Sequence, residues 1–217
     1  MLYLVSTPIG NLEDITFRAI HVLQEVDYIL CEDTRQAGKL MKHYGITTNL
    51  KVYHAQNHHK VGAHILEELL AGKTIALISD AGTPLISDPG ILLVKEAIQK
   101  GIQIIPIPGA SALLSGLVIS GCDTNQFEFL GFVPHKKGRH TLFQSIAEKQ
   151  HTVVFYESTH RILKTLEQLV EFCPHKYIAV GRELTKMFEE CVRGTPEEVF
   201  EHFKNNPTKG EFVVVVN

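Results

Sequence analysis

Hydroxyl groups, carboxylates and glycines are concentrated in one segment of this sequence, from Ser79 to Gly90. The segment SDAGTPLISDPG holds two aspartates, two glycines and two prolines, and it follows an apolar run of strand length. Glycine permits positive φ and close backbone approach, and proline stiffens a loop. Such a loop can present backbone N–H and C=O groups to a ligand. The alternative is a long turn in which Asp88 caps the next helix.

Two other segments carry groups that could bind or react. In Glu32-Asp33-Thr34-Arg35, two adjacent carboxylates could bind a ribose hydroxyl or act as a general base. The alternative is that Asp33 caps a helix and Arg35 is its solvated neighbour. In Pro108-Gly109-Ala110-Ser111-Ala112, small side chains precede a helix. That arrangement suits a flat ligand such as an adenine, and it equally suits simple capping and tight packing.

Several familiar motifs are absent, and this narrows the chemistry. The first loop, from Ser6 to Asn11, has a single glycine and no G-x-G-x-x-G, which disfavours a nicotinamide or flavin site. The histidines of the central region do not share one helical face and have no cysteine nearby, so the sequence favours hydrogen-bonded or solvated rings over a metal site. These histidines are His54, His58, His59 and His64. We expect no metal.

A basic segment runs from Pro134 to His140 and contains Lys136, Lys137 and Arg139. It could contact nucleic-acid phosphates, or it could be an ordinary solvated loop. The whole chain of 217 residues has a net charge of −3, which confines any RNA contact to a local basic patch. With 44% hydrophobic and 21% charged residues, the composition is that of a globular protein and excludes collagen-like, disordered and coiled-coil chains.

The elements that must position these groups are short strands alternating with helices. We predict strands at 2–6, 27–31, 50–53, 74–79 and 102–107, with Asp14 capping the first helix. Strands that are apolar throughout indicate a mostly parallel sheet covered on both faces. Ligands bind at the carboxyl ends of such strands. The loops expected to form the site are therefore 6–14, 31–36, 79–90 and 107–112.

A change in pattern near Gly121 predicts a second domain. The run Gly121-Cys122-Asp123-Thr124-Asn125 is the expected linker, and strands dominate after it. Thr195-Pro196-Glu197-Glu198 predicts a helix start with a capping box and proline at its first position. We expect an α/β fold of two α/β domains, 1–121 and 122–217, with a mostly parallel N-terminal sheet and a mixed C-terminal sheet.

The four cysteines are far apart, with no C-x-x-C pair, which is typical of buried cytosolic thiols. No apolar run reaches the roughly 20 residues of a membrane span. Met1 leads directly into an apolar strand without a basic region or cleavage site, so no signal peptide is expected. We expect a cytoplasmic protein that does not enter a membrane.

Eight blocks of the sequence, in order, resemble the tetrapyrrole methylase (class III) superfamily of S-adenosylmethionine-dependent methyltransferases. The blocks are LYLVSTPIGNLEDIT, CEDTR, ALISDAGTPLISDPG, IPIPGASA, FLGFVPHKKGR, VVFYESTHR, GRELTKMFEE and KGEFVVVV. Within the superfamily they are most similar to the branch that methylates a ribose 2′-hydroxyl of a cytidine in 16S small-subunit ribosomal RNA. The resemblance implies a homodimer, S-adenosyl-L-methionine as cofactor, and small-subunit ribosomal RNA or the 30S subunit as partner.

The resemblance also implies site residues. The cofactor contacts fall on Pro8, Ala81, Gly82, Thr83, Ile86, Ser111, Ala112, Tyr156 and Gly210. Candidates for the base that removes the hydroxyl proton are Asp33, Asp88, Glu157 and Lys186, of which Asp33 and Asp88 rank first; a lysine would need a lowered pKa. The residues expected to hold RNA phosphates are Arg35, Lys136, Lys137, Arg139 and Arg161.

The sequence departs from the family pattern at a few positions. Ser6 stands where glycine is usual, and Cys31 where alanine is usual; both are small. Relatives commonly continue beyond the last strand, whereas this sequence stops at Asn217, so RNA affinity or acceptor choice is expected to differ. The alternatives are a methyltransferase of the same fold acting on a tetrapyrrole or on a protein of the diphthine type, or a non-catalytic RNA-binding module. Intact cofactor loops argue against the last.

Overall fold

The computed structural model describes residues 1–217, which form two compact units, Met1–Ser111 and Ala112–Asn217. The division falls earlier than the expected boundary after Gly121. The helix α5 (Ala112–Ser120) accounts for the difference, because it packs against the sheet of the second unit. Its Gly116 lies directly over Val213 of that sheet. Apolar packing thus assigns the helix to the second unit, although its sequence continues the alternation of the first.

The first unit is built on a five-stranded parallel sheet, as the uniformly apolar runs predicted. Its order is β3-β2-β4-β1-β5, and every neighbouring pair is parallel. The strands are β1 (Leu2–Val5), β2 (Tyr28–Cys31), β3 (Leu50–Val52), β4 (Ile75–Ile78) and β5 (Ile104–Ile107). Because all five run the same way, the loops that follow them leave from one edge of the sheet.

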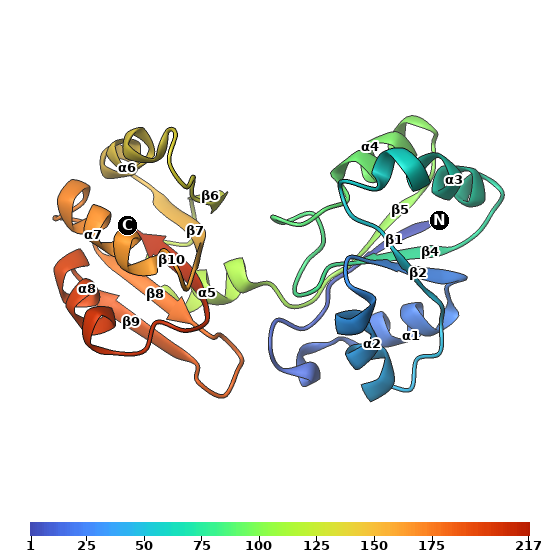
Figure 1. Cartoon of the computed structure of the whole chain (residues 1–217), viewed down its shortest axis with the longest axis horizontal. Helices are drawn as coiled ribbons and strands as arrows, with labels where there is room; N and C mark the ends of the chain where they lie inside the picture. The colour runs from blue at the N-terminus through green and yellow to red at the C-terminus, as the bar shows by residue number, and fades with distance from the viewer. The chain divides into compact units, whose positions relative to one another are not determined.

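Helices cover both faces of this sheet, with α1 and α2 on one face and α3 and α4 on the other (Figure 1). Along β2, Ile29 and Cys31 pack on the first pair, whereas Tyr28 and Leu30 pack on the second. A strand that is buried on both faces has no polar alternation. The helices are α1 (Phe17–Glu25), α2 (Thr34–His43), α3 (His58–Leu70) and α4 (Ile91–Gln99).

The start of α1 differs from the expected one. Asp14 does not cap this helix; it lies in a short 3₁₀ helix, Leu12–Asp14, that is capped by Asn11. The cap of α1 is Thr16, whose hydroxyl accepts a hydrogen bond from the Ala19 N–H at 3.1 Å. Both residue types suit the role, and the extra turn decides between them.

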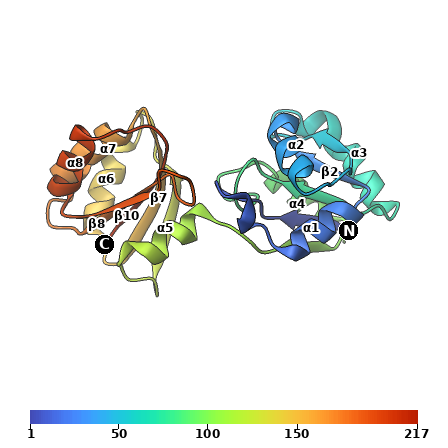
Figure 2. The ribbon, with the colours of Figure 1, turned by 90° about the horizontal axis from the view of Figure 1, so that it is seen from below.

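The second unit contains a mixed five-stranded sheet in the order β6-β7-β10-β8-β9. Only β6 and β7 are parallel neighbours. Three helices, α6, α7 and α8, cover one face, and α5 covers the other (Figure 2). The elements are β6 (Phe127–Phe132), α6 (Arg139–Glu148), β7 (Thr152–Ser158), α7 (Ile162–Phe172), β8 (Ile178–Arg182), β9 (Glu190–Gly194), α8 (Pro196–Asn205) and β10 (Glu211–Val216).

Polar signals at the ends of these elements behave as the sequence predicted. The capping box of α8 is present, with the Thr195 hydroxyl accepting from the Glu198 N–H and the Glu198 carboxylate accepting from the Thr195 N–H.

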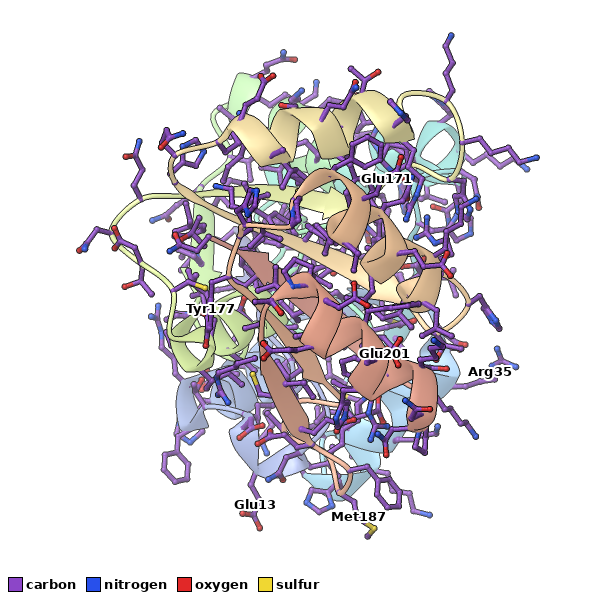
Figure 3. All side chains as sticks on the ribbon, turned by 90° about the vertical axis from the view of Figure 1, so that its left-hand side faces the viewer. Glu13, Arg35, Glu171, Tyr177, Met187 and Glu201 are labelled. Carbon is purple, nitrogen blue, oxygen red and sulfur yellow. The ribbon has the colours of Figure 1, made fainter.

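The carboxylates of Glu171 and Glu201 project from α7 and α8, and Met187 projects from the β8–β9 loop (Figure 3). None of the helices combines the length and apolar character that a bilayer crossing requires.

The contact between α5 and β10 yields a test of the packing. A Cβ on Gly116 would lie 2.5 Å from Cγ1 and 2.8 Å from Cβ of Val213. We expect Gly116→Ala to lower the free energy of unfolding by about 1–3 kcal/mol, because the helix must move away from the sheet. Urea denaturation measures this change.

Gly38 in α2 provides the matched control, because a Cβ there would meet nothing within 4 Å. We expect Gly38→Ala to raise the free energy of unfolding by up to about 1 kcal/mol, through helix propensity alone. Equal effects of the two substitutions would contradict the steric account of Gly116.

Candidate functional site

Three loops of the first unit are bonded together at the carboxyl edge of its sheet. Thr7, after β1, and Gly82, after β4, exchange backbone hydrogen bonds of 2.9 and 3.0 Å. The Thr83 hydroxyl donates to the carbonyl of Ala110, after β5, at 3.2 Å, which leaves it to accept from the Ser6 hydroxyl at 3.0 Å. The loops that the sequence selected at β1, β4 and β5 therefore form one surface.

Glycines let these loops come close together. Gly82 has a φ of +79°, and a Cβ on it would lie 3.3 Å from Cγ2 of Ile9. A Cβ on Gly109 would lie 3.0 Å from Cβ of Ser6. Farther along the same segment, Leu85 and Ser87 adopt left-handed backbone conformations with φ of 72° and 67°. Residues other than glycine rarely adopt such backbone conformations, and those that do are concentrated at functional sites.

Of the residues expected to contact a cofactor, six belong to this loop surface or its flanks in the first unit. These are Pro8, Ala81, Gly82, Thr83, Ile86 and Ser111. The structure brings Gly82 and Thr83 into direct contact with the loops that carry Pro8 and Ser111. The side chain of Ile86 is 37% exposed, so the surface offers an apolar group beside backbone polar groups.

The other three, Ala112, Tyr156 and Gly210, belong to the second unit. The Tyr156 hydroxyl accepts a hydrogen bond from the N–H of Leu113 at 3.1 Å, near the start of α5. The Tyr156 ring makes edge contacts with Phe129 and Phe132, with centroids 5.0 and 5.5 Å away. Gly210 has a φ of +134°, and its N–H donates to the Thr159 hydroxyl at 2.6 Å.

The two aspartates ranked first as bases have opposite environments. Asp33 caps α2 and accepts a paired hydrogen bond from the Arg35 guanidinium at 2.7 and 3.1 Å. The hydrogen bonds from the side chain and the N–H of Arg35 lower the pKa of Asp33 to about 2. Asp33 is therefore a weak base, and the structure agrees with the capping alternative.

Asp88 is the stronger base of the pair. Burial, together with the negative charges of Glu32 and Asp80, raises the pKa of Asp88 to about 6, against a hydrogen bond from Ser79. It does not cap α4, whose N-cap is Gly90 and has no side-chain cap. Asp88 and Glu32 both line a cavity of about 340 Å³ at the end of β2. A carboxylate with a pKa near 6 is ionised at neutral pH and still accepts a proton readily.

The remaining two candidates for the base are held in ion pairs. The ammonium of Lys186 donates to Glu183 at 2.9 Å and to Glu211 at 2.7 Å. Burial acts to lower the pKa of Lys186, but these carboxylates raise it above its ordinary value, opposite to what a base requires. Glu157 is buried and bonded to Arg161 at 2.9 Å and to Thr165 at 2.6 Å. Both expectations are corrected by these contacts.

The five residues expected to contact phosphates separate into two groups. Arg139 is buried, and its guanidinium donates to Gln168, the Pro134 carbonyl and Thr165. Arg161 is 16% exposed and pairs with Glu157. The expectation that these two arginines face RNA is therefore corrected. In contrast, Lys136 and Lys137 are exposed, and the Arg35 side chain is 88% exposed, although it pairs with Asp33.

Two residues near Asp88, namely Asp80 and His54, had no individual role predicted from the sequence. Asp80 accepts a hydrogen bond from the Asp33 N–H at 3.3 Å, which joins the loops after β4 and β2. His54 lies on the same cavity as Asp88 and follows β3 closely. Their positions could have indicated a place in the site, because Asp80 and His54 each lie within two residues of a strand end. Of the histidines, His58 is a buried ring bonded to Tyr53 at 3.0 Å and Glu96 at 3.2 Å.

The chain thus has two α/β units, the first with a five-stranded parallel sheet whose strand-end loops are bonded together at its carboxyl edge. The family model of the tetrapyrrole (corrin/porphyrin) methylases matches residues 1–199. The chain belongs to this family, and its methyl donor is S-adenosylmethionine.

Curated relatives are similar over nearly the whole chain. "Ribosomal RNA small subunit methyltransferase I" of Halalkalibacterium halodurans is 48% identical over 216 residues, covering 99% of this chain and 75% of its own. The Bacillus subtilis protein of the same name is 47% identical over 217 residues, covering 100% of this chain and 74% of its own.

Solved structures share the fold at much lower identity. Diphthine synthase matches with a TM-score of 0.75 at 16% identity, over 99% of this chain and 88% of that one. Cobalt precorrin-4 methyltransferase matches with a TM-score of 0.73 at 14% identity, over 100% of this chain and 94% of that one. These likenesses establish the architecture common to the three chains.

The loop surface fits a methyl donor that carries an adenine and a ribose. The hydroxyls of Ser6 and Thr83 bond the loops to one another, and the exposed Ile86 side chain offers an apolar contact. Backbone groups recognise the edge of a flat heterocycle, and an apolar side chain covers its face. Its glycines bring the backbone itself close to the ligand.

The environment of Asp88 predicts how stability depends on pH. Its pKa is raised from 3.8 to about 6, so ionisation of Asp88 destabilises the folded state as the pH rises through that window. We expect Asp88→Asn to be more stable than the wild type above about pH 6, by at most about 3 kcal/mol, and equal to it near pH 4. Urea unfolding at the two pH values measures the difference.

For Asp33→Asn we expect a change in stability of the opposite sign. The lowered pKa of Asp33 contributes stability that is present above about pH 4 and is lost as the pH falls toward 2. We expect this variant to be less stable than the wild type at neutral pH. Changes of the same sign in the two variants would contradict the assigned environments.

Proposed function

We propose that this protein transfers a methyl group from S-adenosylmethionine to the ribose 2′-hydroxyl of a cytidine in 16S small-subunit ribosomal RNA. The observation that carries the proposal is 48% identity, over 99% of this chain, to an enzyme named for methylation of this RNA. The direct test is incubation with methyl-labelled S-adenosylmethionine and small ribosomal subunits, followed by mapping of 2′-O-methylation. Label on bases, on protein or nowhere would refute the proposal.

The proposed cofactor contacts are those of the loop surface and of the second unit. In the first unit they are Pro8, Ala81, Gly82, Thr83, Ile86 and Ser111; in the second, Ala112, Tyr156 and Gly210. The bonded loops support this assignment, because backbone groups that are already fixed bind a ligand without a further ordering cost. Bound there, S-adenosylmethionine supplies a methyl group already activated by its sulfonium.

The protein's own task is to align the acceptor hydroxyl and remove its proton. The 2′-oxygen forms a bond to the methyl carbon as the bond from carbon to sulfur breaks, and the hydroxyl proton passes to a carboxylate. We assign that carboxylate to Asp88, because its pKa near 6 combines ionisation at neutral pH with basicity. The Arg35 pair leaves Asp33 too weak a base for this step.

Asp88→Asn tests the assignment of the base. We expect kcat to fall by about 10²–10⁴-fold, the usual contribution of a general base, with little change in the dissociation constant of S-adenosylmethionine. In the wild type, kcat/KM is expected to rise with pH and level off above about pH 6, as Asp88 loses its proton. Labelled-methyl assays and calorimetry provide both readouts.

Asp33→Asn serves as the comparison, because it removes a neighbouring carboxylate of low basicity. We expect this variant to keep the pH profile of the wild type. Full activity of Asp88→Asn would reject Asp88 as the proton acceptor, and loss of turnover in Asp33→Asn with intact cofactor affinity would return that role to Asp33.

We propose that RNA phosphates are contacted by Lys136, Lys137 and Arg35. Both lysines are exposed on the loop between β6 and α6, and the following residue, Gly138, is the N-cap of that helix with a φ of +80°. Unlike Arg139 and Arg161, neither lysine is held in a salt bridge of the core. An exposed lysine can bind an RNA phosphate, and it releases the counterions associated with that phosphate.

The double variant Lys136→Ala/Lys137→Ala tests these contacts. We expect the slope of log Kobs for RNA against log salt to become shallower by about 1.5, since each lost phosphate contact removes about 0.7–0.9. Lys100→Ala is the control, because that lysine is exposed just beyond α4 in the first unit. Equal slopes in the wild type and the double variant would exclude the loop from the RNA interface.

We also propose that the chain acts as a homodimer in the cytoplasm, where small ribosomal subunits are found. The helix α5 supports the first part, because it exposes Val118 (69%) and Leu114 (51%) on the side away from its own sheet. A helix that is apolar all round is normally buried on every side. A second copy of the chain would provide that burial.

A further inference from the structure

The cavity beside Asp88 has walls from three segments of the first unit. They are Glu32 after β2, residues 53–56 after β3, and residues 88–92 at the start of α4. None of the proposed cofactor contacts lines it. Its volume of about 340 Å³ lies at the lower end of the roughly 300–1,000 Å³ of small-molecule sites. A space of this size suits one nucleoside better than a tetrapyrrole macrocycle.

The wall of the cavity carries one hydrogen-bond acceptor and one hydrogen-bond donor. The Glu32 carboxylate is exposed and makes no hydrogen bond or ion pair within the chain. His54 accepts a hydrogen bond on Nδ1 from the Asn57 N–H at 3.2 Å. Its neutral ring must therefore carry its proton on Nε2, which makes that nitrogen a donor. The wall thus offers a carboxylate acceptor and an imidazole donor.

Hydrogen bonds to α3 and α4 hold one wall of the cavity in place. Tyr53, on the wall, is buried, and its hydroxyl lies 3.0 Å from Nδ1 of His58. The other nitrogen of His58 lies 3.2 Å from Glu96 of α4. Gly62 leaves the space for this ring, because a Cβ there would lie 2.7 Å from Cε1 of His58. A chain of hydrogen bonds therefore joins the β3 loop to α3 and α4 and holds the wall in place.

We propose that this cavity receives the base of the acceptor nucleotide and that Glu32 accepts a hydrogen bond from the exocyclic amino group of a cytosine. The inference rests on the proposed function and names how its substrate is recognised. A carboxylate is the side chain that accepts from cytosine N4. Uracil would place a carbonyl oxygen against the same carboxylate, and two acceptors cannot pair. His54 suits the O2 carbonyl of the ring.

Recognition in this place also explains the position of Asp88. Single-stranded RNA bases are read when they are turned away from their neighbours and bound in protein pockets. A cytosine bound in the cavity keeps its own ribose attached, and Asp88, the proposed proton acceptor, lines the same cavity. Glu32 contributes twice in this arrangement, because its charge also helps raise the pKa of Asp88.

The test compares cytidine with uridine at the methylated position. The position is first mapped with wild-type protein, and subunits are then reconstituted with RNA that carries either nucleotide there. We expect the wild type to prefer cytidine in kcat/KM by roughly 5- to 150-fold, the discrimination of a well-formed pair. In Glu32→Gln, whose amide can also donate, the preference is expected to fall to about one, mainly through reduced methylation of cytidine.

Glu67→Gln is the matched control, because Glu67 is a glutamate of α3 whose side chain is 78% exposed outside the cavity. It should keep the wild-type preference. Leu92→Trp is the second variant, which fills the cavity from its apolar side. We expect it to raise KM for RNA at least about 10-fold while the affinity for S-adenosylmethionine is unchanged. This readout stands even where Glu32→Gln does not fold.

The outcomes separate the inference from the function on which it rests. Absence of any 2′-O-methylation by the wild type overturns both. Methylation of RNA with equal use of cytidine and uridine, or an undiminished preference in a folded Glu32→Gln, overturns the inference alone. An unchanged KM in Leu92→Trp also overturns it. A preference that is lost in Glu32→Gln, kept in Glu67→Gln and accompanied by a raised KM in Leu92→Trp supports it.

Discussion

The backbone bridge between Thr7 and Gly82 is the contact on which the candidate site depends. Loops that leave neighbouring parallel strands have no ladder to hold them together, and each is solvated unless other bonds form. Here two backbone hydrogen bonds join the loops after β1 and β4, and hydroxyl bonds through Thr83 add the loop after β5. Because Gly82 is left-handed and Gly109 lies against Ser6, side chains at either glycine would separate these loops.

Burial and charge then divide the roles of two aspartates that lie near one edge of the sheet. Asp33 gains an arginine partner and a helix N-terminus, and both favour its charged form. Asp88 loses solvent and faces Glu32 and Asp80, which disfavour its charged form. The same side chain therefore becomes a structural cap in one place and a basic group in the other. This contrast is the physical basis for assigning the proton transfer to Asp88.

The second unit uses its charges mainly for structure. Glu157, at the end of β7, bonds to Thr165 and Arg161 and lies 3.6 Å from Arg139, so one carboxylate connects the strand to α6 and α7. Removal of one partner from such a buried set typically costs about 3–5 kcal/mol, because a charge is left without compensation. Two arginines that looked like phosphate ligands in the sequence are thereby explained as partners of this buried carboxylate. The exposed lysines of the preceding loop do not share these partners.

Amino-acid order was enough to predict the parallel sheet, the capping box of α8 and the loops at the strand ends. Each of these rests on a local pattern: continuous apolar runs, a Thr-Pro-Glu-Glu start, or glycine and proline after a strand. Local patterns also favoured a hydrogen-bonded role for His58, which the structure shows. The start of α1 was missed, because Asp14 and Thr16 are both common N-cap residue types and only the extra 3₁₀ turn separates them.

Tertiary structure alone decided which ionisable groups are solvated and which are paired. Nothing in the spacing of Arg139 and Glu157 shows that they meet in the core, and nothing local to Asp88 places Glu32 near it. Those proximities arise when strands far apart in the chain become neighbours in a sheet. A pKa depends on burial and on charges within a few ångströms, so it follows from the folded arrangement and not from residue type.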